Sequence, residues 1–151
     1  MMRALLLAGL VIAALAGPAR ATDPVLDGAV KAAVPLTSAL LSTLPAREID
    51  LSYQTSKGIE SGHYRGVLLW TLVERAGLQP LPDKNGEIRR TLLITGRDGY
   101  AAALALGEID PQYEGKAVLL SVEKDGTLHL LVPGDQHGGR NVRDVVRIEI
   151  R

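Results

Sequence analysis

The chain of 151 residues contains no cysteine. That absence excludes disulfides, thiolate metal sites, iron–sulfur clusters and cysteine nucleophiles. Neither a phosphate-binding P-loop nor a Gly-x-Gly-x-x-Gly stretch occurs, so the common nucleotide fingerprints are missing as well. Charge of one sign is not in excess, because 17 Lys and Arg stand against 17 Asp and Glu. No nucleic-acid partner is therefore expected, since such proteins carry a basic surface interleaved with aromatic residues.

Histidines are few and dispersed. No two of the three histidines stand at i, i+4 spacing, and no carboxylate cluster accompanies them. The sequence therefore supports neither a protein-ligated zinc site nor a serine–histidine–acid triad. We expect His129 to lie on a strand and His63 to lie in a flexible loop.

One apolar run stands at the N-terminus. It extends from Ala4 to Ala16 behind Arg3, and a small-x-small end follows at Ala19-Arg20-Ala21. This pattern predicts a signal peptide at residues 1–21 with cleavage after Ala21. The run is shorter than the roughly 20 residues of a membrane-spanning helix. We therefore expect a periplasmic or secreted protein without a transmembrane segment in the mature chain; an uncleaved membrane anchor is the alternative.

Periodicity divides the remainder into a weakly structured N-terminal arm, residues 22–36, and one domain, residues 37–151. Thr37 can cap a short helix that ends at Pro45. Polar and apolar residues alternate over residues 47–55, which predicts a half-buried strand. A polar loop is expected at residues 56–66. Leu69, Leu72, Val73 and Ala76 then form the apolar stripe of a helix that ends at Gly77.

The second half of the domain reads as strands joined by tight turns. Asp-Gly turns separate two pairs of apolar runs, which predicts two hairpins. The expected strands are residues 90–95, 100–106, 116–123, 127–133 and 145–151, the last with Val146, Ile148 and Ile150 facing inward. Because hairpins cannot build an all-parallel sheet, the predicted fold class is α+β, with mixed or antiparallel strands and a few short helices.

A glycine-rich basic segment, residues 133–143 and called here the glycine loop, precedes the last strand. Glycines without a Cβ let the backbone present N–H groups to a ligand, and arginine forks bind phosphate or another oxyanion. His137 can donate a hydrogen bond near neutral pH. The pattern indicates a site for a phosphate-bearing ligand. An ordinary tight connection with solvated charges stays open as the alternative.

Four stretches in order resemble the molybdopterin-binding oxidoreductase domain of the sulfite oxidase type. They are "YRGVLLWTLVERAGL" (64–78), "ITGRDGYAAALALGEID" (94–110), "AVLLSVEKDG" (117–126) and "LLVPGDQHGGRNVRDVVRIEI" (130–150). The resemblance implies the α+β sulfite-oxidase fold. It also implies that the glycine loop holds the phosphate and ring of molybdopterin, through a Gly-x-Arg-x-Val-Lys pattern with Arg143 in place of the lysine. The candidate cofactor-binding residues are then His137, Gly138, Gly139, Arg140, Asn141, Arg143 and, from the strand of residues 47–55, Thr55.

Two departures from the family bear on function. The cysteine that binds molybdenum in catalytic members corresponds to Thr55, whose hydroxyl is a poor ligand beside a soft thiolate. The N-terminus also has no Arg-Arg pair, the mark of proteins exported folded with their cofactor. We expect a module that binds a pterin, another phosphate-bearing ligand or a partner protein, without thiolate-ligated molybdenum. An active molybdenum-cofactor-dependent oxidoreductase and a non-catalytic subunit serving a redox partner protein are the alternatives.

Overall fold

The computed structural model describes residues 23–151, so the predicted signal peptide lies outside the described residues. The strands of this part of the chain are β1 (Val25–Gly28), β2 (Val34–Pro35), β3 (Ala46–Thr55), β4 (Gly58–Leu68), β5 (Thr91–Gly96), β6 (Ala101–Ala105), β7 (Leu119–Val122), β8 (Leu128–Leu131) and β9 (Val145–Ile150). The helices are α1 (Ser38–Leu41), α2 (Leu69–Ala76) and α3 (Leu106–Ile109), with 3₁₀ turns η1 (Gly86–Arg89) and η2 (Gly138–Arg140). Within residues 23–151, no helix is long and apolar enough to cross a membrane.

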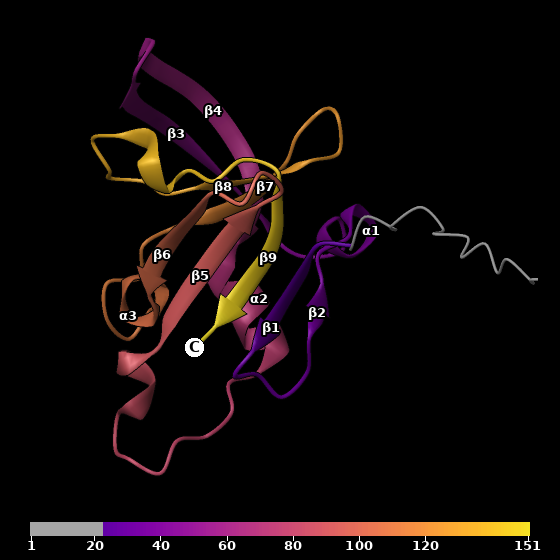
Figure 1. Ribbon diagram of the computed structural model, residues 1–151, viewed down its shortest axis with the longest axis vertical. Coiled ribbons are helices and arrows are strands. Elements are labelled where there is room, and N and C mark those ends of the chain that lie inside the picture. Colours follow the sequence, from indigo (N-terminus) through magenta and orange to yellow (C-terminus); the bar gives the residue numbers. More distant parts are fainter. Residues whose placement is uncertain (1–22) are drawn as a thin grey trace, which may run out of the picture.

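Two sheets organise the fold (Figure 1). A five-stranded sheet has the order β2-β1-β9-β5-β6, and a four-stranded sheet has the order β3-β4-β7-β8. All neighbouring strands are antiparallel except β1 and β9, which run parallel. Mostly antiparallel sheets with few helices agree with the predicted α+β class. Both predicted hairpins, β5–β6 and β7–β8, form around their Asp-Gly turns.

The main core contains buried residues of both sheets and of α1, α2 and α3. The predicted stripe of α2 is buried, with Leu69, Leu72, Val73 and Ala76 each at most 2% exposed. Burying each of the larger side chains contributes about 1.5–3 kcal/mol. Gly77 ends the helix with φ +67°, a conformation that glycine adopts without strain. In β9, Ile148 and Ile150 face the core as predicted.

Three expectations were wrong. The arm of residues 22–36 is not weakly structured, because β1 and β2 lie within it and β1 pairs with both β2 and β9. Residues 58–66 are strand rather than loop, since β4 pairs with β3 from Gly58 to Val67. Val146, expected to face inward, is only half-buried, and Val145 lies in the core instead. The pairing of β5 with β9 shifts register at this point, between Thr95 and Gly96.

The long hairpin of β3 and β4, called here the β3–β4 ribbon, projects from the body of the fold (Figure 1). Only its base continues the sheet, through Val67 and Leu68 paired with β7. One face of the ribbon is polar and exposed. The opposite face carries Leu51 and Tyr53, which pack with Leu119 and Leu131 in a second small core. The ribbon therefore places the end of β3 beside the glycine loop.

Candidate functional site

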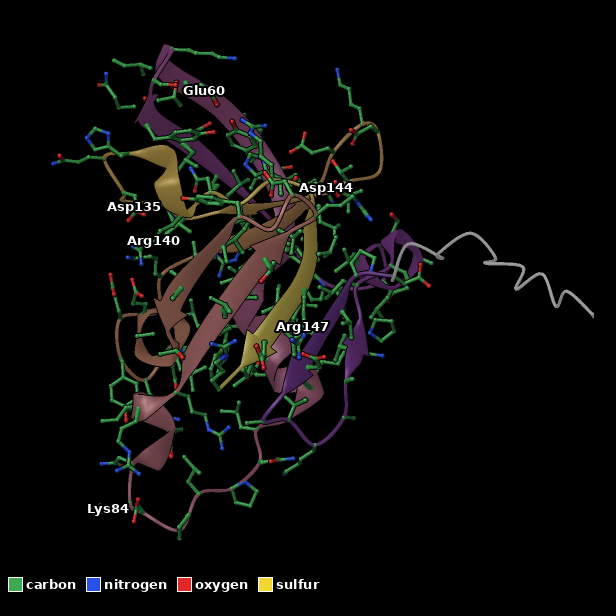
Figure 2. All side chains as sticks on the ribbon, viewed as in Figure 1. Glu60, Lys84, Asp135, Arg140, Asp144 and Arg147 are labelled. Atoms are coloured by element: carbon green, nitrogen blue, oxygen red, sulfur yellow. The ribbon has the colours of Figure 1, made fainter. Side chains whose placement is uncertain are left out.

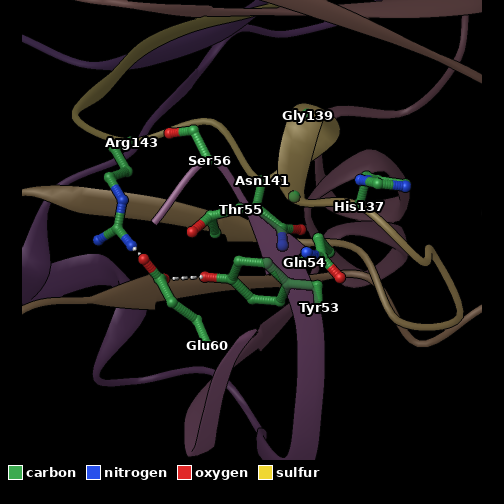
Figure 3. A pocket seen from close by; sticks show the side chains of 10 residues that line it. Tyr53, Gln54, Thr55, Ser56, Glu60, His137, Gly139, Asn141 and Arg143 are labelled. Atoms are coloured by element: carbon green, nitrogen blue, oxygen red, sulfur yellow. Dashed lines mark hydrogen bonds and ion pairs between the residues drawn. The ribbon is translucent and has the colours of Figure 1, made fainter. Parts of the chain in front are cut away.

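A pocket of about 330 Å³ lies between the end of β3 and the glycine loop (Figure 3). It is lined by Tyr53, Gln54, Thr55, Ser56, Glu60, His137, Gly138, Gly139, Asn141 and Arg143. Six of the seven candidate residues thus meet around one space, although Thr55 is distant in sequence from the others. The volume of the pocket lies at the lower end of the range for small-molecule sites.

Two hydrogen bonds to backbone carbonyls hold the glycine loop against β3 and the residue before β6. The Gln54 N–H donates to the Gln136 carbonyl at 2.9 Å, and the Tyr100 hydroxyl donates to the Gly139 carbonyl at 2.6 Å. Gly138 lies against the ring of Tyr53, so close that a Cβ at this position would stand 2.6 Å from a ring carbon. A glycine is therefore required at position 138 for the close approach of the Tyr53 ring, which is a packing reason, whereas a Cβ at Gly139 would meet its nearest atom only at 3.8 Å.

Asn141 places an unpaired donor at the pocket. The residue is 9% exposed, and its Oδ1 accepts a hydrogen bond from the Val132 N–H at 2.8 Å. This bond fixes the orientation of the amide, so that Nδ2 is the atom left over. Nδ2 is buried without any hydrogen-bond partner. Leaving a buried polar group unsatisfied costs about 1–3 kcal/mol, which an acceptor supplied by a ligand would recover.

Tyr53 and Glu60, which the sequence did not single out, form the opposite wall. They are cross-strand partners in the β3–β4 ribbon. The Tyr53 hydroxyl donates to Glu60 Oε2 at 2.9 Å, and Arg143 Nη2 donates to the same oxygen at 3.0 Å. Burial and then the Glu60 acceptor raise the pKa of Tyr53, so its hydroxyl stays a donor. The alternation that placed Tyr53 on the same face as Thr55 was the signal that could have identified it.

Arg140 does not line the pocket. Its Nε and Nη2 donate to the two oxygens of Asp135 at 2.8 and 2.7 Å, and its Nη1 donates to Glu108 at 2.9 Å. Figure 2 shows Arg140 and Asp135, both part of the glycine loop, beside each other. Hydrogen bonds from Arg140 lower the pKa of Asp135. Both carboxylates neutralise this guanidinium, so Arg140 anchors the loop to α3 instead of facing the pocket.

Thr55 does line the pocket, but its hydroxyl is engaged in the turn of the ribbon. Thr55 Oγ1 donates to the Gly58 carbonyl at 2.9 Å and accepts from the Lys57 N–H at 3.1 Å. A hydroxyl with both roles filled is a poor ligand for molybdenum, which prefers a soft thiolate. Among residues 23–151, moreover, no group of three or more His, Cys, Asp or Glu side chains lies together as a metal site.

The other two histidines lie outside the pocket. His63 is exposed on β4, where its Nδ1 lies 2.8 Å from Asp50. That carboxylate raises the pKa of His63. His129 is buried in β8, as a strand residue, and its Nδ1 lies 3.1 Å from Glu123. Neither position suggests participation in the site between β3 and the glycine loop.

The fold has a counterpart among solved structures. The structure is similar to the crystal structure of the sulfane dehydrogenase SoxCD from Paracoccus pantotrophus, with a TM-score of 0.67 and 18% sequence identity. The likeness covers 85% of this chain but only 37% of that chain. At this identity it shows a shared fold. No protein-family model matches the chain, and neither does any curated protein.

Proposed function

We propose that this domain binds a small phosphate-bearing ligand, a pterin phosphate among the candidates, in the pocket between β3 and the glycine loop. The observation that carries the proposal is the buried, unpartnered Nδ2 of Asn141 at this pocket. Arg143 adds a cation to the same wall, and charge-assisted hydrogen bonds to an anion are the stronger kind. The fold shared with part of a sulfane dehydrogenase and the sequence resemblance to sulfite-oxidase-type domains support an origin among oxidoreductases.

The residues present do not fit a thiolate-ligated molybdenum. The chain has no cysteine, and the Thr55 hydroxyl already makes both of its turn contacts. The acceptor-rich organic part of molybdopterin, with its phosphate, does suit a wall of Asn141 and Arg143. Binding without a redox step at molybdenum is therefore the function proposed here. Export through the signal peptide of residues 1–21 is part of the same proposal.

A role as the non-catalytic subunit of a redox complex is the second candidate. Ile59, at the tip of the β3–β4 ribbon, is 73% exposed, and it adjoins Glu60 at the pocket. In this candidate, the exposed Ile59 side chain at the projecting tip would contact the partner protein. A stable equimolar complex that Ile59→Ser disrupts would favour this candidate. A monomer that binds an organic phosphate and tolerates Ile59→Ser would favour the first.

Asn141→Asp tests the first candidate. The aspartate keeps an oxygen for the Val132 N–H but replaces the unpartnered Nδ2 with a charged acceptor. Titration calorimetry with a pterin phosphate and a purine nucleotide should show saturable binding to the wild type. We expect the variant to bind at least tenfold more weakly, since a charge-assisted or buried hydrogen bond contributes about 1.5–3 kcal/mol.

Asn85→Asp is the matched control, because it introduces the same charge at an asparagine that does not line the pocket. It should bind like the wild type. Absence of saturable binding to the wild type, or equal binding by Asn141→Asp, would contradict the proposal.

A further inference from the structure

Glu60 holds two donors of the pocket at one oxygen. Its Oε2 accepts from the Tyr53 hydroxyl at 2.9 Å and from Arg143 Nη2 at 3.0 Å, as the dashed lines in Figure 3 show. Among the described residues, the guanidinium of Arg143 makes no side-chain hydrogen bond other than this one. A carboxylate of the chain itself therefore lies where an oxyanion of a ligand would find two convergent donors.

The contact between Glu60 and Arg143 is easily opened. The Arg143 side chain is 63% exposed and the Glu60 side chain is 41% exposed. Ion pairs with this exposure contribute little to stability, because water solvates both partners once they separate. Glu60 lies on the projecting ribbon and can turn its carboxylate into solvent. Tyr53, by contrast, is only 4% exposed and is packed against Gly138, so its hydroxyl keeps its place.

We infer that Tyr53 and Arg143 form an oxyanion subsite that Glu60 fills until the oxyanion of a ligand displaces it. The inference rests on the proposed function and names the part of the pocket that takes the charged group of the ligand. The ligand class is an organic molecule with a phosphate, sulfate or carboxylate group, one oxygen of which takes the place of Glu60 Oε2. The Asn141 amide in the same pocket then binds an acceptor on the remainder of the ligand.

Charge explains why such an internal competitor matters. While Glu60 is in place, its negative charge offsets that of Arg143 and repels an incoming anion. At about 4 Å, two charges still interact by about 1 kcal/mol even in water. Removing the charge of Glu60 should therefore raise the affinity for anions, whereas removing a carboxylate that does not contact Tyr53 and Arg143 should have little effect.

The test is titration of the full chain with inorganic phosphate, sulfate and acetate, with binding measured from the amide chemical shifts of the pocket residues. Glu60→Gln keeps the shape and removes the charge. We expect it to bind phosphate about five- to tenfold more tightly than the wild type, because the ion pair with Arg143 and the repulsion of the incoming anion are both lost. Arg143→Ala should bind at least tenfold more weakly, and Tyr53→Phe, which keeps the ring beside Gly138, severalfold more weakly.

Glu48→Gln is the control, since it removes the same charge from the exposed face of the same ribbon. An equal gain in Glu48→Gln would show a general charge effect and overturn the subsite. If the wild type binds an anion and Glu60→Gln binds it equally well or more weakly, the subsite is also overturned, but the proposed function stands. No binding of these anions or of organic phosphates by wild type or Glu60→Gln would overturn both. Comparing the three anions shows whether the subsite prefers tetrahedral groups or a planar carboxylate.

Discussion

Arg140 should matter more for the stability of the glycine loop than for direct contact with a ligand. It forms a two-bond pair with Asp135 and a further contact with Glu108, and all three side chains are between 19% and 31% exposed. Hydrogen bonds to charged groups contribute about 1.5–3 kcal/mol, and exposed pairs contribute about 0–1. For these partly exposed pairs we expect Arg140→Ala to cost about 2–3 kcal/mol in the free energy of unfolding, or roughly 6–15 °C in Tm for a domain of this size.

The assay is urea unfolding, with Arg89→Ala as the control. Arg89 pairs with Asp83 at an exposed position, so its loss should change stability by less than about 0.5 kcal/mol. Ligand affinity should fall less in Arg140→Ala than in Arg143→Ala, because only Arg143 lines the pocket. Stability of Arg140→Ala within 0.5 kcal/mol of the wild type would refute this assignment of roles.

The same network predicts a dependence on pH. Hydrogen bonds from Arg140 lower the pKa of Asp135, and although burial alone would raise the pKa of Glu108, bonds from Arg140, the Ala105 N–H and Lys116 leave it lowered. Groups with a lowered folded pKa stabilise the fold fully above their unfolded values of about 3.9 and 4.3, and this stability is lost as pH falls through the folded values. The penalty of Arg140→Ala should therefore be largest near neutral pH and shrink below about pH 4.

Two further predictions concern packing and a buried histidine. Gly138→Ala should lower the free energy of unfolding by about 1–3 kcal/mol and weaken ligand binding, because the added Cβ would meet the Tyr53 ring. Gly107→Ala is the control: open space surrounds Gly107, so this variant should be neutral or slightly stabilising when both are compared by thermal unfolding. Burial lowers the pKa of His129, and the charge of Arg143 lowers it further. As pH falls below about 6.5, this histidine is therefore protonated in the unfolded chain but not in the folded one, and the free energy of unfolding should fall. His129→Leu should lose less stability than the wild type between pH 7.5 and 5.5; an equal loss would contradict this prediction.

Local patterns predicted the elements whose partners are close in sequence. The Asp-Gly turns specify the β5–β6 and β7–β8 hairpins, and the spacing of apolar residues specifies α2. By contrast, β1 is stabilised by pairing with β9 at the other end of the chain, and its own Pro- and Gly-containing neighbourhood reads as irregular. β4 was missed because most of its exposed face is polar and its ladder depends on β3.

The pocket was predictable in position but not in all of its roles. Glycines and arginines before the last strand indicated an anion site, and six candidates do meet around one pocket. The two arginines look alike in sequence, yet Glu108 and Asp135 hold Arg140 while Arg143 faces the pocket. Glu108 lies on α3, distant in the chain, so no spacing rule could have paired it with Arg140.

Metal and ligand content of the protein purified from its natural host tests the central claim most directly. Inductively coupled plasma mass spectrometry measures molybdenum, and native mass spectrometry followed by extraction identifies any bound organic phosphate. We predict a stoichiometric phosphate-bearing ligand with no stoichiometric molybdenum. Equimolar molybdenum in the folded protein would contradict the account, because this cysteine-free chain would then hold the metal without a thiolate ligand.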